Sequence, residues 1–284
     1  MSPNTRRHFL TGVAALTAAS ATSTAARAST VAEHHWGDLR LAVATYSLRA
    51  FSREQAISIV RQLGIKYVNV KSFHLPYYLS KEDLAAARAE FEKAGLEIVS
   101  GGNVSLQSED EGFIRRHLEY AKNAGMPTVV CAPTTTNLKL VEKHAKELDL
   151  KIAIHNHGPE DSHFPNGASV MKYVKDMDPR MGLCYDIGHA CRTGADVIEE
   201  LEAAGDRLHD IHIKDLTDFS DRGSQVAVGK GKVPVADIFK TLKKMRYNGV
   251  VGLEYEVEPA TPERGMDASF SYMRGLLDGQ ASAS

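Results

Sequence analysis

Histidines and carboxylates recur near the ends of apolar segments in the second half of the chain. The four segments are KIAIHNHG (151–158), GLCYDIGH (182–189), LHDIHIKD (208–215) and GLEYE (252–256). Because successive side chains of a strand point to opposite faces, Ala153, His155 and His157 share one face of the first segment, while Ile152 and Ile154 share the other. Each segment predicts a strand with one apolar face and one face that becomes polar toward its C-terminal end.

The polar faces of these predicted strands carry His155, Asp186, His212 and Glu254. Imidazole nitrogen and carboxylate oxygen are ligands of borderline divalent ions such as Zn²⁺, Mn²⁺, Co²⁺ or Fe²⁺. Burying several such groups without an ion or a partner is costly. The sequence therefore predicts one divalent metal ion of unspecified identity. The register stays open at two positions, since His157 shares a face with His155, and Glu256 shares a face with Glu254.

A repeated alternation of elements would position these strands. Helical stretches close near a glycine or a short polar turn, and a β-branched run follows within a few residues. Seven such runs, together with RLAVATYS (40–47), predict eight strands. Ser52, Ser80 and Ser108 are predicted helix N-caps, and Gly64, Gly95 and Gly125 suit the C-terminal ends of helices.

This alternation of strand and helix predicts parallel strands, and thus the α/β class. Eight units over about 240 residues favour a closed (β/α)8 TIM barrel in a single domain. An open doubly wound sheet is disfavoured, because no G-x-G-x-x-G follows the first predicted strand. In such a barrel the C-terminal strand ends meet on one face, so the polar side chains are expected to line a pocket there.

The N-terminus carries the pattern of an export signal. NTRRHFLTG contains the paired Arg6 and Arg7, an Ala-rich stretch follows, and Ala26-Arg27-Ala28 fits a cleavage site after Ala28. We predict a twin-arginine signal peptide at 1–28, a linker at 29–39, the barrel at 40–278 and a tail at 279–284. The mature protein is expected in the periplasm or outside the cell. It should lack a membrane anchor, because no segment approaches the roughly 20 apolar residues that a span needs.

Composition bounds the class of protein. A content of 43% hydrophobic and 25% charged residues supports a full buried core rather than disorder. Without the three arginines of the leader, 31 basic residues face 36 acidic ones, a net charge of −5. No basic excess favours nucleic acid as a partner. Three cysteines do not make a disulfide framework in a chain of 284 residues.

The motifs KIAIHNHGPED, GLCYDIGHACRTG, LHDIHIKD and GLEYE, in this order and spacing, resemble the xylose isomerase-like TIM-barrel superfamily. That superfamily includes sugar epimerases, hydroxypyruvate isomerases, inosose dehydratases and endonuclease IV, and the resemblance covers residues 40–277. In its sugar epimerases a Glu, an Asp, a His and a Glu at the ends of the fifth to eighth strands hold one metal ion. The resemblance assigns these places to His155, Asp186, His212 and Glu254, and it matches His189 to a substrate-binding histidine.

The chain departs from that pattern at His155, where the epimerases have a glutamate. Their two glutamates act as acid and base on opposite faces of the substrate carbon, so a symmetric two-base mechanism is in doubt here. Glu254 remains the candidate base for a proton α to a carbonyl, with His155, His157 or Lys214 as the acid.

Further candidates surround this set. Lys71 and Lys214 are expected to polarise a carbonyl or stabilise an enolate oxygen, although a salt bridge at the barrel rim is an equal alternative for each. Substrate contacts are expected from His74, His157, His189 and Glu256. The loop SQVAVGKGKVP (224–234) lacks the P-loop spacing, so a solvated turn is favoured there over a phosphate site.

Three functions fit these residues. The first is a metal-dependent sugar isomerase or epimerase that acts on a keto-sugar by enolisation. The second is a lyase or hydratase that eliminates a β-substituent from a 3-keto-glycoside, for which one base suffices. The third is a periplasmic sugar-binding module without catalysis. The expected partner is a small sugar, and a homo-oligomer stays open because the family often forms dimers or tetramers.

Overall fold

The computed structural model describes residues 39–221 and 223–282. The predicted signal peptide at 1–28 and the linker, up to residue 38, lie outside the described residues. Within the described ranges, no helix combines the length and the apolar character that crossing a membrane requires.

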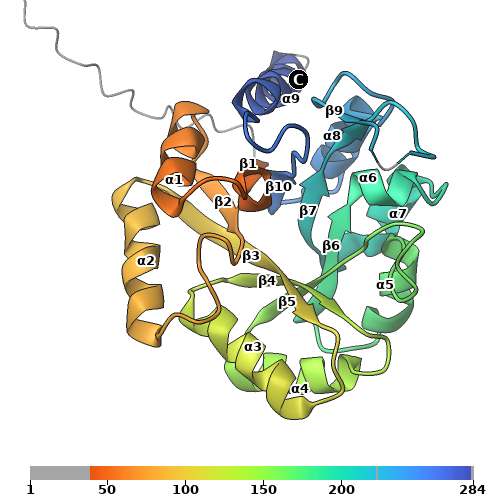
Figure 1. The fold of residues 1–284 in the computed structure, drawn as a ribbon. Helices are drawn as coiled ribbons and strands as arrows, with labels where there is room; N and C mark the ends of the chain where they lie inside the picture. Colours follow the sequence, from red (N-terminus) through yellow and green to blue (C-terminus); the bar gives the residue numbers. More distant parts are fainter. Residues whose placement is uncertain (1–38, 222, 283–284) are drawn as a thin grey trace, which may run out of the picture. The chain divides into compact units, whose positions relative to one another are not determined.

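Eight parallel strands close into a barrel, as Figure 1 shows. Around the barrel each strand neighbours the next, in the order β1-β10-β7-β6-β5-β4-β3-β2. The strands are β1 (Arg40–Ala44), β2 (Tyr67–Val70), β3 (Glu97–Leu106), β4 (Thr128–Pro133), β5 (Lys151–His155), β6 (Met181–Asp186), β7 (Leu208–Ile213) and β10 (Val250–Leu253). The predicted α/β class and TIM barrel are confirmed, with a strand in each of the eight predicted segments.

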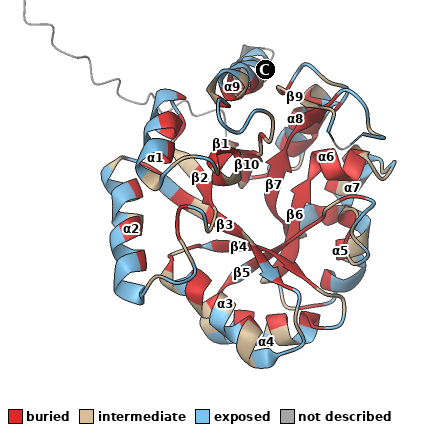
Figure 2. Cartoon of the chain, in the orientation of Figure 1, coloured by how far each residue is buried: buried red, intermediate tan, exposed pale blue. Residues whose placement is uncertain are grey.

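Helices surround the barrel, with buried inner and exposed outer faces (Figure 2). They are α1 (Arg53–Gln62), α2 (Lys81–Lys93), α3 (Glu111–Asn123), α4 (Leu138–Leu148), α5 (Gly167–Val174), α7 (Val197–Ala204), α8 (Val235–Lys244) and α9 (Glu263–Ser282). A short helix, α6 (Ile187–Cys191), follows β6 directly, and a small antiparallel pair, β8 (Asp215–Leu216) with β9 (Gln225–Val226), follows β7. Both additions stand at the carboxyl ends of their strands, where the polar residues gather.

Local signals in the sequence explain where several helices begin. Ser52 forms a capping box with Gln55 at the start of α1, and Ser80 accepts a hydrogen bond from the backbone N–H of Asp83 at the start of α2. The first two predicted N-caps are therefore confirmed.

The third predicted N-cap is wrong. The helix α3 begins at Glu111, and its cap is Asp110, whose Oδ1 accepts a hydrogen bond from the backbone N–H of Phe113 at 2.8 Å. Ser108 instead accepts a hydrogen bond from the backbone N–H of Asp110 at 3.1 Å. Asp competes well with Ser for this position because its negative charge also complements the positive end of the helix dipole.

The strands separate two apolar regions. Ile152 and Ile154 belong to the large core between the barrel and the helices, as the alternation predicts. Val130, Ala153 and Cys184 form a small cluster of their own on the opposite, inward faces. Toward the carboxyl ends of the strands, these inward faces become polar.

Candidate metal centre and active site

Four adjacent strands deliver the predicted metal donors to one place. His155 ends β5, Asp186 ends β6, His212 lies near the end of β7, and Glu254 follows β10. One donor atom from each of these residues lies within 4.8 Å of all the others. The structure thus groups His155 and Glu254, rather than His157 and Glu256, with the remaining donors.

The distances in this cluster fit a divalent ion. His155 Nε2 lies 3.1 Å from His212 Nδ1 and 3.4 Å from Asp186 Oδ2, and His212 Nδ1 lies 3.7 Å from Glu254 Oε1. Two imidazole nitrogens on a tetrahedral zinc ion, each at about 2.0–2.1 Å from it, would be about 3.3 Å apart. Asp186 Oδ2 is buried without a well-aligned hydrogen bond. Cys184 forms a second donor group with His155 and His212, deeper in the barrel.

Asn156 and the start of α6 fix the orientation of Asp186. The Asn156 side chain donates to the carbonyl of Asp186 at 3.0 Å and accepts from its N–H at 2.8 Å. Asp186 Oδ1 caps α6 by accepting a hydrogen bond from the N–H of His189 at 2.8 Å. Because Oδ1 is engaged in the cap, Oδ2 is left to face the donor cluster.

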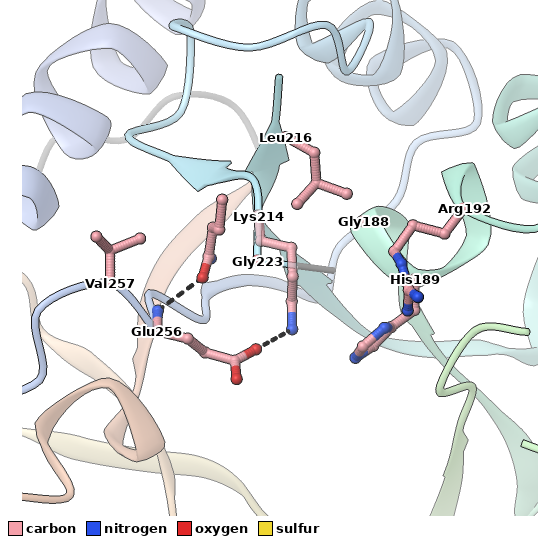
Figure 3. Close-up of a pocket in the computed structure, with 9 residues that line it drawn as sticks. Gly188, His189, Arg192, Lys214, Leu216, Gly223, Glu256 and Val257 are labelled. Carbon is pink, nitrogen blue, oxygen red and sulfur yellow. Dashed lines mark hydrogen bonds and ion pairs between the residues drawn. The ribbon is translucent and has the colours of Figure 1, made fainter. Parts of the chain in front are cut away.

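Lys214 lies between three carboxylates and is almost fully buried; Figure 3 shows its contact with one of them, Glu256. Its Nζ lies 2.7 Å from Glu254 Oε2, 2.7 Å from Glu256 Oε1 and 3.1 Å from Asp186 Oδ2. Burial alone would lower the pKa of Lys214, but the carboxylates raise it well above its ordinary value. A Cβ at Gly188 would lie 2.2 Å from Cγ of Lys214, so only glycine lets α6 pass this close to the lysine stem.

The electrostatics keep Glu254 ionised and His155 neutral, and they favour positive charge at His212. Burial would raise the pKa of Glu254, yet the Lys214 ammonium and His212 lower it well below its usual range. Burial, with His157 adding to the effect, lowers the pKa of His155 to about 3, so that its imidazole is neutral. Burial would also lower the pKa of His212, but Glu254 raises it, which shows that this position attracts positive charge.

A pocket of about 150 Å³ opens beside the donor cluster. It is lined by Tyr46, Lys71, Asn103, His155, His157, His189, Glu254 and Glu256. The structure therefore brings the predicted Lys71, His157, His189 and Glu256 to the same pocket. Tyr46 and Asn103 were not predicted.

The wall opposite Glu254 is built around His157. Asn103 Nδ2 donates to His157 Nε2 at 2.7 Å, and His157 Nδ1 donates to Asp161 Oδ2 at 3.3 Å. Lys71 Nζ donates to the carbonyl of Asn103 at 3.1 Å, and burial lowers the pKa of Lys71. Strand alternation does not place Asn103 in the pocket, because the pairing of β3 with β4 shifts register between Gly101 and Val104.

His74 does not reach this pocket, contrary to its predicted contact with substrate. Its side chain is fully buried, and burial lowers its pKa. Its backbone carbonyl accepts a hydrogen bond from Arg53 at the start of α1, at 3.2 Å. His74 stands in a turn after β2, which ends at Val70, so the alternation of side chains along the strand does not extend to it.

The loop 224–234 is organised by Asp215. Asp215 Oδ2 accepts hydrogen bonds from the N–H groups of Gly229 and Gly231, both at 2.9 Å, and Oδ1 accepts from Val233 at 3.0 Å. These backbone donors are thus engaged by a carboxylate, as expected of a turn rather than of a phosphate cradle.

The fold and the site together define the class of protein. It is a parallel α/β barrel with a candidate metal centre at the carboxyl ends of its strands. The chain belongs to the family described as Xylose isomerase-like TIM barrel, which matches residues 57–276. The resemblance to this family is confirmed.

Known proteins similar to this chain include sugar-modifying enzymes. An inosose dehydratase of Geobacillus kaustophilus (strain HTA426) is 30% identical over 131 residues, which are 40% of this chain and 42% of that protein. The chain thus aligns with less than half the length of this curated relative.

Two solved structures share the fold. One is the IolI protein with a bound zinc atom, at a TM-score of 0.71 and 18% identity over 84% of this chain and 98% of that one. The other is L-ribulose 3-epimerase, at a TM-score of 0.70 and 15% identity over 86% of this chain and 96% of that one. At these identities the likeness extends to the fold alone.

Proposed function

We propose that this protein is a divalent-metal-dependent enzyme that removes a proton α to the carbonyl of a keto-sugar or sugar derivative, as an isomerase or epimerase. The observation that carries this proposal is the convergence of His155, Asp186, His212 and Glu254, with one donor atom each within 4.8 Å of the others. The family and the names of its similar proteins support a sugar-like substrate.

The four donors would hold the ion, which when bound would draw electron density from the substrate carbonyl oxygen. Glu254 takes the proton from the α carbon, and the electron pair of the broken C–H bond moves to the carbonyl oxygen to form an enolate. Lys214 keeps Glu254 ionised and oriented through its 2.7 Å contact with Oε2. Lys71 and His157 on the opposite wall stabilise the enolate oxygen and return a proton.

A lyase is the second candidate, because the carboxylates that line the pocket all follow β10, so that only one side of the substrate faces a carboxylate base. Among its described lining residues, Glu254 and Glu256 both follow β10, whereas the wall around His157 offers Lys71 and Asn103. In an elimination the enolate electrons expel a substituent from the β carbon, and a protonated group donates a proton to the leaving oxygen. A single carboxylate base suffices for that reaction.

Metal content measured by elemental mass spectrometry tests whether the four donors bind a divalent ion. We expect about one divalent ion per chain, lost in His155→Ala and in Asp186→Ala. His117→Ala on α3 is the matched control, since this half-buried histidine lies outside the donor cluster and should leave the metal in place. A wild-type protein that takes up no metal on reconstitution would contradict the proposal.

Incubation of keto-sugars in D₂O, followed by NMR, tests the reaction. Deuterium at the α carbon of an intact sugar supports an isomerase or epimerase, and an unsaturated product with a released group supports a lyase. A metal-loaded protein that binds sugar but exchanges no proton would instead be a binding module.

We also propose that the mature chain is exported by the twin-arginine route. Support comes from the paired Arg6 and Arg7 and from Ala26-Arg27-Ala28, whose pattern predicts cleavage after Ala28. N-terminal sequencing of the protein from a periplasmic fraction should begin at Ser29.

A further inference from the structure

A second cavity of about 390 Å³ adjoins the pocket at the metal donors. The two share His189 and Glu256 as lining residues. The cavity lies between α6 and the residues that follow β7 and β10 (Figure 3). Pockets for small ligands usually measure about 300–1,000 Å³, so the 150 Å³ pocket alone is small for a complete substrate. The adjoining cavity supplies the remaining room.

The charged side chains along this cavity are already paired. Arg192 forms a two-pronged ion pair with Glu160, with 2.9 Å between Nη1 and Oε2. Lys214 is held by Glu254 and Glu256. A phosphate group needs cationic donors to bind it, and among the described lining residues both cations are engaged by carboxylates.

The remaining lining is apolar or internally hydrogen-bonded. Leu216 and Val257 supply apolar side chains to the lining of the cavity (Figure 3). Gln225 donates to the carbonyl of Glu254 at 2.7 Å and accepts from the N–H of Glu256 at 2.9 Å, so its amide is occupied. His189 lines both the cavity and the smaller pocket. The cavity therefore offers apolar side chains, and His189 and Glu256 stand at its junction with the smaller pocket.

We propose that the substrate is a glycoside, whose sugar ring occupies the pocket at the metal donors while an uncharged, ring-sized aglycone occupies the adjoining cavity. This inference rests on the proposed function for the sugar ring. The aglycone packs on Leu216 and Val257, and His189 at the junction contacts the oxygen that links the two parts.

Binding of unreactive glycosides tests the cavity separately from the reaction. Calorimetry on the metal-loaded protein would compare 4-nitrophenyl glucopyranoside with methyl glucopyranoside, neither of which carries the keto group that enolisation needs. We expect the aryl glycoside to bind at least tenfold more tightly. Equal affinities, or tighter binding of glucose 6-phosphate than of the aryl glycoside, would overturn the inference.

Substitutions locate that difference in the cavity. Val257→Phe and Leu216→Phe should each reduce the affinity for the aryl glycoside about tenfold relative to the methyl glycoside, since a few added carbons fill the space. The half-buried position of Val257 provides a variant that folds even if the buried Leu216 does not tolerate a larger ring. Ala86→Phe on the exposed face of α2 is the control and should leave the preference unchanged. A preference that survives both cavity variants would place the aglycone elsewhere.

Proton exchange from 3-keto-glucose in D₂O separates this inference from the proposed function. If the aryl glycoside is preferred but no keto-sugar exchanges a proton, the proposed reaction fails and the cavity assignment stands. If 3-keto-glucose exchanges while the aryl group adds no affinity, the reaction stands and the cavity assignment fails.

Discussion

An imidazole at position 155 replaces the glutamate found in the epimerases that this chain resembles. His155 keeps a donor atom 3.1 Å from His212 and 3.4 Å from Asp186. His155 cannot take over the role of the second glutamate as a base. Burial lowers its pKa to about 3, and its lone pair faces the donor cluster. In the proposed reaction, proton removal would therefore fall to the residues after β10.

Two glutamates after β10 can be told apart by substitution. Glu254→Gln should reduce proton exchange by about 10²–10⁴-fold, because it removes the proposed base and a metal donor. Glu256→Gln should cost less, since Glu256 Oε1 contacts Lys214 and lies outside the donor group. Exchange rates and metal content of the two variants provide the measurement. A larger loss in Glu256→Gln would assign the base to that residue instead.

Asp161, which contacts His157 in the pocket wall, should make the free energy of unfolding depend on pH in the acid range. Burial would raise the pKa of Asp161, but His157 and the N–H groups of His163 and Phe164 lower it to about 2. A carboxyl with a depressed folded-state pKa contributes stability that is full above its unfolded value near pH 4 and is lost as the pH falls toward 2. Asp161→Asn should cost about 1 kcal/mol at pH 7 after allowance for solvent screening. Denaturant unfolding at pH 7 and pH 2.5 should show the gap to wild type shrinking in acid; a constant gap would refute the linkage.

At the scale of elements, the carboxyl end of each strand and the helix or turn after it act as one unit. Asp186 ends β6, caps α6 and contributes to the donor cluster. Asp215 follows β7 and holds the loop 224–234 through three backbone N–H groups. Polar residues at strand ends thus serve structure and chemistry together, which is why a polar residue alone does not identify its role.

The start of α3 offers a test at this scale. Asp110→Ala should destabilise the protein by about 1 kcal/mol, because the N–H of Phe113 loses its side-chain acceptor. Ser108→Ala should cost less, since the Ser108 hydroxyl accepts a hydrogen bond only from the N–H of Asp110, outside the helix. Thermal unfolding of both variants measures the difference. Equal losses would show that the turn before α3, rather than the cap, limits stability.

At the scale of the whole molecule, a bound metal should stabilise the fold. The donors come from four strands that are far apart in sequence, so unfolding disperses them. At a metal concentration 100 times the dissociation constant, the stabilisation is about 2.7 kcal/mol, which corresponds to about 5–10 °C in Tm for a domain of this size. Scans with Mn²⁺ or Zn²⁺ and with a chelator should differ by this amount in wild type and not in Asp186→Ala.

The barrel could be predicted because strand and helix segments alternate along the chain, and the donors could be predicted because side chains alternate between the two faces of each strand. Ile152 and Ile154 had to face the helices, which placed His155 inward with Asp186 and His212. Asn103 and Asp161 could not be found in this way, because one follows a register shift in β3 and the other lies in a loop. His74 was misplaced for a related reason, since the alternation ends with β2 at Val70.

The burial of Lys214 among carboxylates has a consequence for charge balance. Asp186, Glu254 and Glu256 carry three negative charges, and the Lys214 ammonium neutralises one of them. With neutral imidazoles at His155 and His212, a divalent cation brings the sum to zero. A glutamate at position 155 would leave one uncompensated anion, and a trivalent ion would leave one uncompensated cation. Charge balance within this cluster therefore favours a divalent ion over a trivalent one, so we expect Fe²⁺ to be retained more tightly than Fe³⁺ when metal content is measured after dialysis.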